Sequence, residues 1–472
     1  MIGRNQEIIL LNEAYNSDQS ELIAIYGRRR IGKTYLVREH FANHLVFETS
    51  GLFNGTLPEQ LRQFASNLKL ASNSHLDIKV PTDWFEAFEM LKSFIINHQK
   101  EDKKVVFLDE LPWMATPKSR FLTAFEGFWN GWASARKDLV IIICGSASSW
   151  MIQKIEKSKG GLYNRVTKRI VLKPFTLTET ELFFQQKNIV LNRRHITELY
   201  MGLGGVPHYL NQIRKSETPE MALSRLILDK DGLLFDEFEN LFISLFGEGG
   251  VHQTIVEILA KNRYGMTRDA LLNKLKLKSG GWFSTILEEL ETSGFIEIQT
   301  PFAKKHKEAV VKVIDNYSLY YMNFRKSKST SISTSNTQEW KIWSGLSFEN
   351  ICMYHAKNIV KTLGINGMNY SISSWQHKGN EEMKGAQIDM IIDRADKAIN
   401  ICEIKFNEHP FIVTKSYAND IRLKMAAFNH FTKNKKTLFC TFITAGSVVA
   451  NAEAKALIQK EITLDDLFGA LL

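Results

Sequence analysis

Apolar and polar positions follow different rhythms in different parts of this 472-residue chain. Between residues 22 and 175, short apolar runs alternate with stretches of helical periodicity. The runs are "LIAIYG", "HLVFET", "VVFLDE", "LVIIICGS" and "RIVLKPF". Strands that alternate with helices in this way are typical of an α/β fold with a parallel sheet.

The pattern divides the chain into four parts and one linker. An α/β core over residues 1–175 precedes a helical lid over 176–247, which "GLGGVP" interrupts. Residues 248–326 predict three short helices and a strand pair with a basic tip, an order that resembles a winged helix. A polar, Ser/Thr-rich linker over 327–338 leads to a second α/β domain over 339–472.

Composition narrows the class of protein only in part. The net charge of +9 is compatible with a polyanion partner but is common among other soluble proteins. Four scattered cysteines without a CxxC pair disfavour a zinc site and fit a reducing compartment. No apolar run approaches the roughly 18 residues of a membrane span, and the N-terminus lacks a signal pattern. We therefore expect a cytoplasmic protein with no membrane partner.

A phosphate-binding loop is the first chemical motif. "GRRRIGKT" fits G-x-x-x-x-G-K-[ST], follows an apolar strand and precedes a segment that can open a helix. Backbone N–H groups of such a turn hold phosphates, while Lys33 would bridge the outer phosphates and Thr34 would ligate Mg²⁺. The residues expected to contact ATP are Gly27, Arg28, Arg29, Arg30, Ile31, Gly32, Lys33, Thr34 and Tyr35.

Two acids complete the motif. Asp109 and Glu110 end the apolar strand of "VVFLDELPW". Asp109 suits a Mg²⁺-coordinating position, and Glu110 can polarise a water for attack on the terminal phosphate. These residues predict an enzyme that binds and hydrolyses ATP.

The motifs in their order resemble the archaeal-type ATPase family, within the AAA-like and signal-transduction ATPases. "IGRNQEIILL", "GRRRIGKT", "FLDELPWM", "CGSASSWM" and "GGVPHYL" carry the resemblance. It implies an ATPase core with a helical lid, a winged helix and a C-terminal domain. It also implies that Ser146 senses the terminal phosphate and that Arg165 completes the site of a second subunit. The alternative for Arg165 is a solvated basic face shared with Lys168 and Arg169.

Near the other end, "IDMIIDRADKAINICEIKF" predicts two strands, around residues 388–392 and 399–406, joined by a polar turn. If the turn is symmetric, residues whose numbers sum to 792 face each other, so Asp389 lies opposite Glu403. Lys405 shares their face, because side chains alternate along a strand. Two opposed carboxylates repel, and burying them requires a counter-charge.

"QID" followed by "EIK" resembles the PD-(D/E)xK nuclease pattern, with Ile388 in place of the leading proline. The expected helix acid is Glu349, flanked on the packed side by Phe348, Ile351, Cys352 and His355. The resemblance implies a restriction-endonuclease-like domain in which Glu349, Asp389 and Glu403 hold Mg²⁺, with the Ile404 carbonyl as a further ligand. Lys405 would orient or deprotonate the attacking water.

The resulting hypothesis is an ATPase switch that controls a DNA-cleaving domain, working as a homo-oligomer through the ATPase core. DNA as the substrate rests on the family's relation to origin-recognition ATPases. One alternative is a nucleotide-dependent signalling or binding protein whose nuclease-like domain does not cut. Another is a kinase that uses the same phosphate loop. The winged helix, with basic Lys304, Lys305 and Lys307 but acidic Glu288, Glu289 and Glu291, could contact DNA or serve only for packing.

Overall fold

The computed structural model describes residues 2–73, 78–98, 102–156, 161–162, 164–247, 250–326 and 337–469. Most of the linker expected over 327–338 lies outside these ranges. The chain forms two compact units. The first comprises Met1–Pro174, Leu241–Gly249 and Glu288–Gly294, and the second comprises Phe175–Asn240, Gly250–Leu287 and Phe295–Leu472.

A parallel sheet of five strands forms the centre of the first unit, in the order β2-β3-β4-β1-β5. The strands are β1 (Glu21–Tyr26), β2 (Leu45–Ser50), β3 (Lys104–Asp109), β4 (Leu139–Gly145) and β5 (Lys168–Val171). Each lies in one of the five predicted apolar runs, so the expected α/β fold with a parallel sheet is confirmed. The inner strands are buried along their whole length, which explains why their sequences do not alternate.

Helices cover both faces of this sheet. Leu22 and Ala24 of β1 join the apolar cluster that α3, α4 and α6 complete, whereas Ile23 and Ile25 join the cluster with α1 and α2. The helical elements are α1 (Asn5–Tyr15), α2 (Lys33–His40), α3 (Leu57–Ala71), α4 (Trp84–Asn97), α5 (Leu111–Met114), α6 (Phe121–Gly131), α7 (Ser148–Met151), a 3₁₀ turn (Ala133–Ala135) and a π turn (Ile152–Glu156).

The second unit begins with the predicted helical lid. Its elements are α8 (Leu177–Gln186), α9 (Arg193–Leu203), α10 (Pro207–Leu210), α11 (Pro219–Leu223), a π turn (Ser224–Leu228) and the start of α12 (Glu237–Phe246), whose residues from Leu241 belong to the first unit. The "GGVP" turn packs directly against the chain's entry into this unit, because the Phe175 N–H donates to the Gly205 oxygen at 2.6 Å. A Cβ on Gly205 would lie 1.9 Å from the Phe175 oxygen, so only glycine fits there.

The middle part of the second unit contains the predicted three helices and strand pair, together with one short extra strand. Its elements are α13 (Val251–Ala260), β6 (Met266–Thr267), α14 (Arg268–Leu275), α15 (Gly281–Thr292), β7 (Ile296–Gln299), a 3₁₀ turn (His306–Glu308), β8 (Val310–Val313), α16 (Asn316–Tyr320) and a π turn (Tyr321–Arg325). The strands form a small antiparallel sheet in the order β6-β8-β7.

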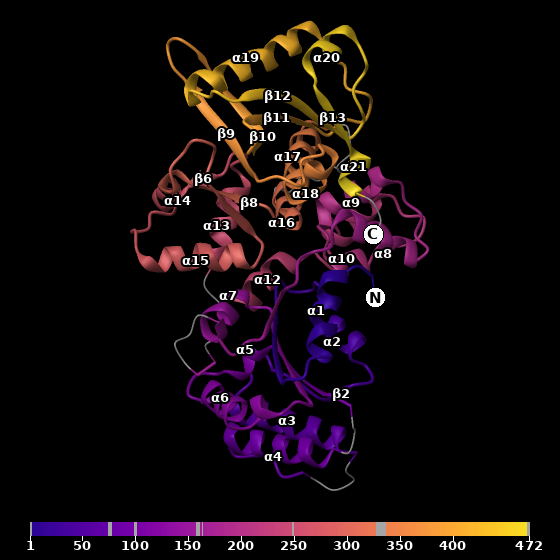
Figure 1. The fold of residues 1–472 in the computed structure, drawn as a ribbon, viewed down its shortest axis with the longest axis vertical. Coiled ribbons are helices and arrows are strands. Elements are labelled where there is room, and N and C mark those ends of the chain that lie inside the picture. Colours follow the sequence, from indigo (N-terminus) through magenta and orange to yellow (C-terminus); the bar gives the residue numbers. More distant parts are fainter. Residues whose placement is uncertain are drawn as a thin grey trace. The chain divides into compact units, whose positions relative to one another are not determined.

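The C-terminal domain is a mixed sheet in the order β13-β12-β11-β10-β9. Strands β9, β10 and β11 are antiparallel neighbours, and β11, β12 and β13 are parallel. Helix α19 lies over one face and α17 over the other (Figure 1). The elements are α17 (Gln338–Tyr354), α18 (Ala356–Thr362), β9 (Tyr370–Gly379), β10 (Lys384–Arg394), β11 (Ala398–Lys405), α19 (Lys415–Thr432), β12 (Thr437–Thr444), α20 (Ala452–Leu457), β13 (Lys460–Thr463) and α21 (Leu464–Phe468).

Polar contacts fasten the lid to the C-terminal domain. The Leu177 N–H donates to His355 Nε2 at 2.9 Å, and His355 Nδ1 lies 2.8 Å from the Ile351 oxygen. Because Nε2 must accept, the proton of the neutral ring belongs on Nδ1. Arg194 donates to the Asn407 oxygen at 2.7 Å and lies over the Phe406 ring.

The middle part is also joined to the C-terminal domain. The Phe302 N–H donates to the Ser374 oxygen at 2.8 Å, and the Phe302 ring packs 5.1 Å from that of Phe428. Asn350 donates from its side chain to the Val313 oxygen at 3.2 Å. The predicted wing therefore has its base packed on β9, while its lysines Lys304, Lys305 and Lys307 remain exposed.

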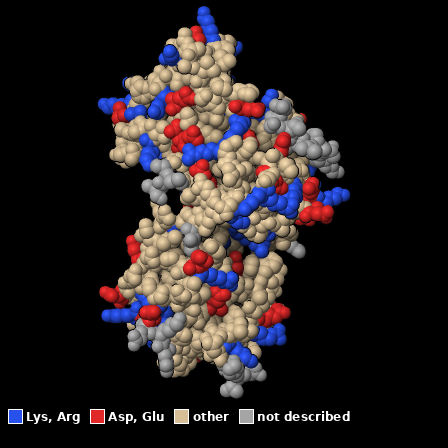
Figure 2. Space-filling model, turned by 90° about the vertical axis from the view of Figure 1, so that its right-hand side faces the viewer, with Lys and Arg blue, Asp and Glu red and all other residues tan. Residues whose placement is uncertain are grey.

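Charge and cysteine placement add two facts. Basic and acidic side chains are interspersed over the face drawn in Figure 2, so the positive net charge does not form a single uniform surface there. All four cysteines are buried and unpaired.

Within the described ranges, no helix is both long and apolar enough to cross a membrane.

We predict that acid loosens the second unit through His355. Burial lowers the pKa of His355 to about 4, against about 6.5 in the unfolded chain. A depressed pKa of this kind gives stability that is complete above pH 6.5 and is lost as the pH falls towards 4, by about 3 kcal/mol. Thermal unfolding midpoints measured from about pH 7 to about pH 4.5 should fall more steeply for wild type than for His355→Gln. Parallel curves would contradict this role.

Candidate functional sites

The predicted nucleotide-binding residues meet at one edge of the first sheet. Strands β1, β4 and β3 are neighbours and parallel, so their carboxyl ends lie side by side. The phosphate loop follows β1, Ser146 follows β4, and Asp109 ends β3. Topology therefore assembles three segments that are more than thirty residues apart in the sequence.

Backbone geometry shapes the loop for an anion. Gly27, Arg30 and Gly32 all have positive φ, at 148°, 70° and 89°. A Cβ on Gly27 would lie 2.2 Å from the Leu172 oxygen, so this position admits only glycine. Turns of this kind, leading into the N-terminus of an eight-residue helix, aim N–H groups at one point and favour negative charge.

Two basic residues hold the loop in place. Buried Lys33 donates from Nζ to the oxygens of Gly27 and Arg28, at 3.0 and 2.9 Å, which lays its ammonium across the loop. Buried Arg4 donates to the Ile31 oxygen at 3.1 Å and to the Lys173 oxygen at 2.6 Å. The sequence motif "IGRNQ" contained Arg4, but its spacing gave no sign that the guanidinium braces the loop.

The acids are held by hydroxyl groups. The Thr34 hydroxyl donates to Asp109 Oδ2 at 2.7 Å. Glu110 has left-handed backbone angles of 46° and 48°, and its Oε2 accepts from the N–H and the hydroxyl of Ser146 at 3.0 and 2.8 Å. Ser146 thus orients one oxygen of Glu110.

The remaining predicted ATP-site residues are less enclosed. Arg28 and Ile31 are buried, Arg29 and Arg30 are half-buried, and Tyr35 is exposed on the first turn of α2. Arg165 is exposed and lies three residues before the start of the edge strand β5. Whether Arg165 acts on another subunit stays a prediction.

The second candidate site lies on the strand pair β10–β11. The observed pairs Met390–Cys402, Ile391–Ile401 and Ile392–Asn400 all sum to 792, so the predicted register is confirmed. This ladder ends at Met390–Cys402, one residue short of Asp389 and Glu403. Strand β10 begins four residues before and ends two residues after the expected 388–392, and β11 is shifted by one residue from the expected 399–406.

Glu403 is surrounded by groups that favour its charged form. Lys405 Nζ lies 2.8 Å from Oε1, Lys424 Nζ lies 2.9 Å from Oε2, and the Tyr417 hydroxyl donates to Oε1 at 2.7 Å. Burial alone would raise the pKa of Glu403, but the two lysines outweigh it and lower the pKa to about 2. Glu403 is therefore ionised at neutral pH.

The surroundings of Asp389, in contrast, favour its neutral, protonated form. Burial first, and then the charges of Glu349 and Glu403, raise its pKa to about 7. Gln387 donates to its Oδ1 at 3.2 Å. Within the described residues it has no ion-pair partner, so a positive charge beside it would be favourable.

Glu349 lies on α17, as predicted, with Phe348, Ile351, Cys352 and His355 all buried around it. Its partners come from the middle part of the same unit. Arg263 lies 2.8 Å from Oε1 and Lys312 lies 3.9 Å from Oε2.

The expectation that Glu349, Asp389 and Glu403 hold one or two Mg²⁺ ions stays a prediction. In the part of the chain that the structure describes, no three His, Cys, Asp or Glu side chains form a metal-binding group. The physical reason is that basic side chains of the chain itself engage two of the three carboxylates. Sequence reasoning missed Arg263, Lys312, Tyr417 and Lys424, because nothing in their local patterns distinguishes them from surface residues.

Comparison with known proteins supports the first site. Residues 1–213 match the family model described as an ATPase domain predominantly from Archaea. An uncharacterized protein of Methanocaldococcus jannaschii, MJECL04, is 26% identical over 422 residues, which are 86% of this chain and 88% of that protein. An uncharacterized ATP-binding protein of the same organism, MJ0423, is 35% identical over 49 residues, which are 10% of this chain and 83% of that protein.

A solved structure shares the fold. The Walker-type ATPase PABY2304 of Pyrococcus abyssi superposes with a TM-score of 0.53 at 18% identity, covering 69% of this chain and 96% of that one. At this identity the likeness concerns the fold alone.

We predict that neutralising Asp389 stabilises the protein at high pH. Its folded pKa of about 7 exceeds the unfolded value near 3.9, so its contribution to stability is lost as the pH rises through 7. In EDTA at about pH 8, the free energy of unfolding of Asp389→Asn should exceed that of wild type by on the order of 2–4 kcal/mol, and its unfolding temperature should be higher. At about pH 4 the two proteins should unfold at the same temperature.

The matched control is Asp393→Asn on the same strand, where the carboxylate pairs with Lys436. This substitution removes an attraction and should not stabilise. Equal effects of the two substitutions at high pH would contradict the charge imbalance at Asp389.

Proposed function

We propose that this chain, whose residues 1–213 form an archaeal-type ATPase domain of the P-loop class, couples ATP hydrolysis to control of a DNA-cleaving centre in its C-terminal domain. The observation that carries the second half is the pairing of Lys405 with Glu403, 2.8 Å apart, on the strand next to half-buried Asp389. A lysine, an ionised acid and an acid without an ion-pair partner in the described residues suit phosphodiester hydrolysis.

At the first site, each residue has a defined task. The loop N–H groups and Lys33 bind the phosphates of ATP and stabilise charge on the oxygens during transfer. Glu110, held by Ser146, receives a proton from the attacking water through its other oxygen. Arg165 of a neighbouring copy would add positive charge at the terminal phosphate.

The donor set beside the loop fits Mg²⁺. Hydroxyl and carboxylate oxygens are its preferred ligands, and in nucleotide sites one or two protein groups suffice, because phosphates and waters supply the rest. Thr34 and Asp109, whose oxygens lie 2.7 Å apart, would hold it. When bound, Mg²⁺ neutralises charge that develops on the phosphates.

At the second site, Asp389 and Glu349 are the carboxylates that would hold a divalent cation, once the ion pairs of Glu349 are exchanged. The fit rests on Asp389, which is half-buried and has no ion-pair partner in the described residues. A bound cation supplies a more acidic water. Lys405, about one-third exposed, would orient the attacking water, and its ammonium charge would stabilise the pentacoordinate phosphorus.

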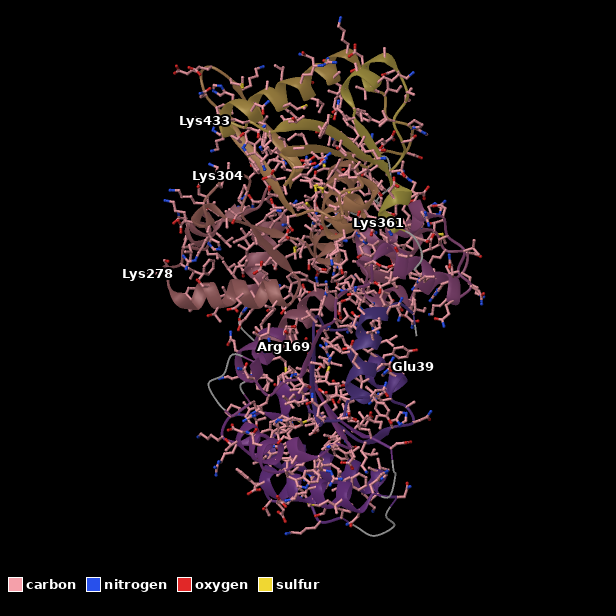
Figure 3. All side chains as sticks on the ribbon, in the orientation of Figure 1. Glu39, Arg169, Lys278, Lys304, Lys361 and Lys433 are labelled. Carbon is pink, nitrogen blue, oxygen red and sulfur yellow. The ribbon has the colours of Figure 1, made fainter. Side chains whose placement is uncertain are left out.

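DNA is proposed as the polyanion on grounds of charge and exposure. Lys278, Lys304 and Lys433 point outward on the same side of the second unit in Figure 3, and all three are exposed. Two belong to the middle part, which we propose to be a winged helix, and the third belongs to the C-terminal domain. Lysines in these positions would contact backbone phosphates rather than bases.

A second candidate function is DNA binding or signalling without cleavage. It is favoured by the engagement of Glu349 with Arg263 and Lys312, since a carboxylate that is permanently paired cannot ligate a metal. Under this alternative, the C-terminal fold would serve as a binding surface that responds to nucleotide.

The ATPase prediction separates binding from hydrolysis. Lys33→Ala should abolish ATP binding, measured by calorimetry, because the loop loses its only ammonium. Glu110→Gln should bind ATP but hydrolyse it at least about 100-fold more slowly, because the water loses its base. Glu39→Gln, an exposed acid on α2 that points outward in Figure 3, is the matched control and should keep both properties. Hydrolysis by Glu110→Gln at the wild-type rate would refute the assigned role.

The cleavage prediction uses supercoiled DNA with Mg²⁺ or Mn²⁺. Wild type should nick it, and Asp389→Ala and Lys405→Ala should each lower the rate by at least roughly 100-fold. Exposed Lys433→Ala tests a surface charge without touching the centre and should change affinity more than rate. Equal nicking by all proteins would exclude this centre and leave the binding alternative.

A further inference from the structure

One carboxylate of the second site receives its counter-charge from a different part of the chain. Arg263 lies in the turn between α13 and β6, and its guanidinium donates to Glu349 Oε1 at 2.8 Å. Lys312 on β8 lies 3.9 Å from the other oxygen, Oε2. Each oxygen of Glu349 thus faces a cation of the middle part.

This cluster differs from an ordinary surface ion pair in the burial of its acid. The Glu349 side chain is only 8% exposed, whereas that of Arg263 is 44% exposed. An exposed pair contributes little, but an acid buried among apolar residues needs a partner. Neither of these two ion-pair partners belongs to α17, so the charge balance of Glu349 depends on the middle part remaining docked.

The docking itself is anchored at the next residue. Asn350 donates to the Val313 oxygen, at the end of the strand that carries Lys312. The helix and β8 are therefore held together beside the cluster. Movement of β8 away from α17 would break this hydrogen bond and withdraw Lys312 from Glu349 together.

Arg263 also acts on the other carboxylate of the site. Its positive charge interacts electrostatically with Asp389 as well as with Glu349. A divalent cation placed between these two acids would occupy the region that the guanidinium now neutralises. Two cations beside the same carboxylates repel each other, so the arginine and the metal compete for the same negative charge.

We propose that Arg263 and Lys312 block the C-terminal centre by acting as the counter-ions of Glu349, so that the centre binds a divalent cation only when the middle part releases α17. This inference rests on the proposed function, because it names the control of that same site. Arg263 is thus a regulating residue and not a catalytic one.

The test measures cation binding rather than cleavage. Binding of Mn²⁺ to the full-length, nucleotide-free protein is followed by the electron paramagnetic resonance signal of free Mn²⁺. The site of interest is the one that Asp389→Asn removes. Arg263→Gln should tighten Mn²⁺ binding at this site by about tenfold or more, because the competing charge is gone. Lys312→Gln should act in the same direction with a smaller effect, since it lies farther from the carboxylate.

Arg268→Gln is the matched control. Arg268 belongs to the same part of the chain, and its guanidinium bonds to Ser279 and Gly280, both at 3.0 Å. Arg263→Lys keeps the charge and should bind Mn²⁺ nearly as weakly as wild type. Circular dichroism on every variant shows whether the fold is retained, and Lys312→Gln decides the question if Arg263→Gln unfolds.

The outcomes separate this inference from the function on which it rests. If wild type, Arg263→Gln and Lys312→Gln bind Mn²⁺ equally, and Asp389→Asn abolishes that binding, the block is refuted while the metal centre stands. If none of the proteins binds Mn²⁺ in a manner dependent on Asp389, both the block and the metal centre are refuted. Tighter binding in Arg268→Gln as well would assign the effect to net charge and also overturn the block.

Discussion

A carboxylate taken out of water must meet a positive charge or enough donors, and this requirement governs both candidate sites. At the ATPase edge, Asp109 and Glu110 are held by the hydroxyls of Thr34 and Ser146. These neutral donors fix the acids in position without cancelling their charge. In the C-terminal domain, by contrast, lysines and an arginine neutralise Glu403 and Glu349, and only Asp389 keeps an unmet demand. Under the proposed function, the first arrangement can receive ATP with its cation, whereas the second must exchange partners before a cation can enter.

The features that sequence alone predicted are those with a local cause. The phosphate loop was readable because its glycines, its lysine and the helix that follows occupy eight consecutive residues. The register of β10 and β11 was readable because a short turn fixes which residues face each other. Even the packed side of α17 followed from helical spacing around Glu349.

The features that sequence did not predict come from distant segments. Arg263 is 86 residues from Glu349, Lys424 is 21 from Glu403, and Arg4 is 27 from Ile31. A single arginine in "AKNRYG" or a lysine in an amphipathic helix has no local mark of its partner. Since such partners are chosen by tertiary packing, periodicity and spacing cannot find them. The consequence was specific: we expected Glu349, Asp389 and Glu403 to hold one or two Mg²⁺ ions, because the sequence does not reveal the basic side chains that engage two of them.

The two interfaces of the C-terminal domain are unequal in kind, and this inequality bears on how a nucleotide signal could reach the second site. The lid contact combines His355, a neutral ring that bonds in both directions, with an exposed ion pair between Arg193 and Asp465. The contact with the middle part combines the Phe302–Phe428 packing with the charged cluster at Glu349. In this cluster the acid is buried, and a metal ion could replace Arg263 and Lys312 as the counter-charge of Glu349.

Binding linkage then makes the two events reciprocal. If docking of the middle part weakens cation binding at Asp389 and Glu349, cation binding must weaken docking by the same factor. Release of the middle part would therefore favour binding of a divalent cation, and the bound cation would in turn stabilise the released state. Any change in the ATPase core that alters docking of the middle part would change the affinity of the second site for a metal ion. The carboxylates of that site are more than 300 residues from Lys33 in the sequence. In this view no rigid path between the sites is required, because the buried charge of Glu349 is balanced either by Arg263 and Lys312 or by a bound cation, and not by both at once.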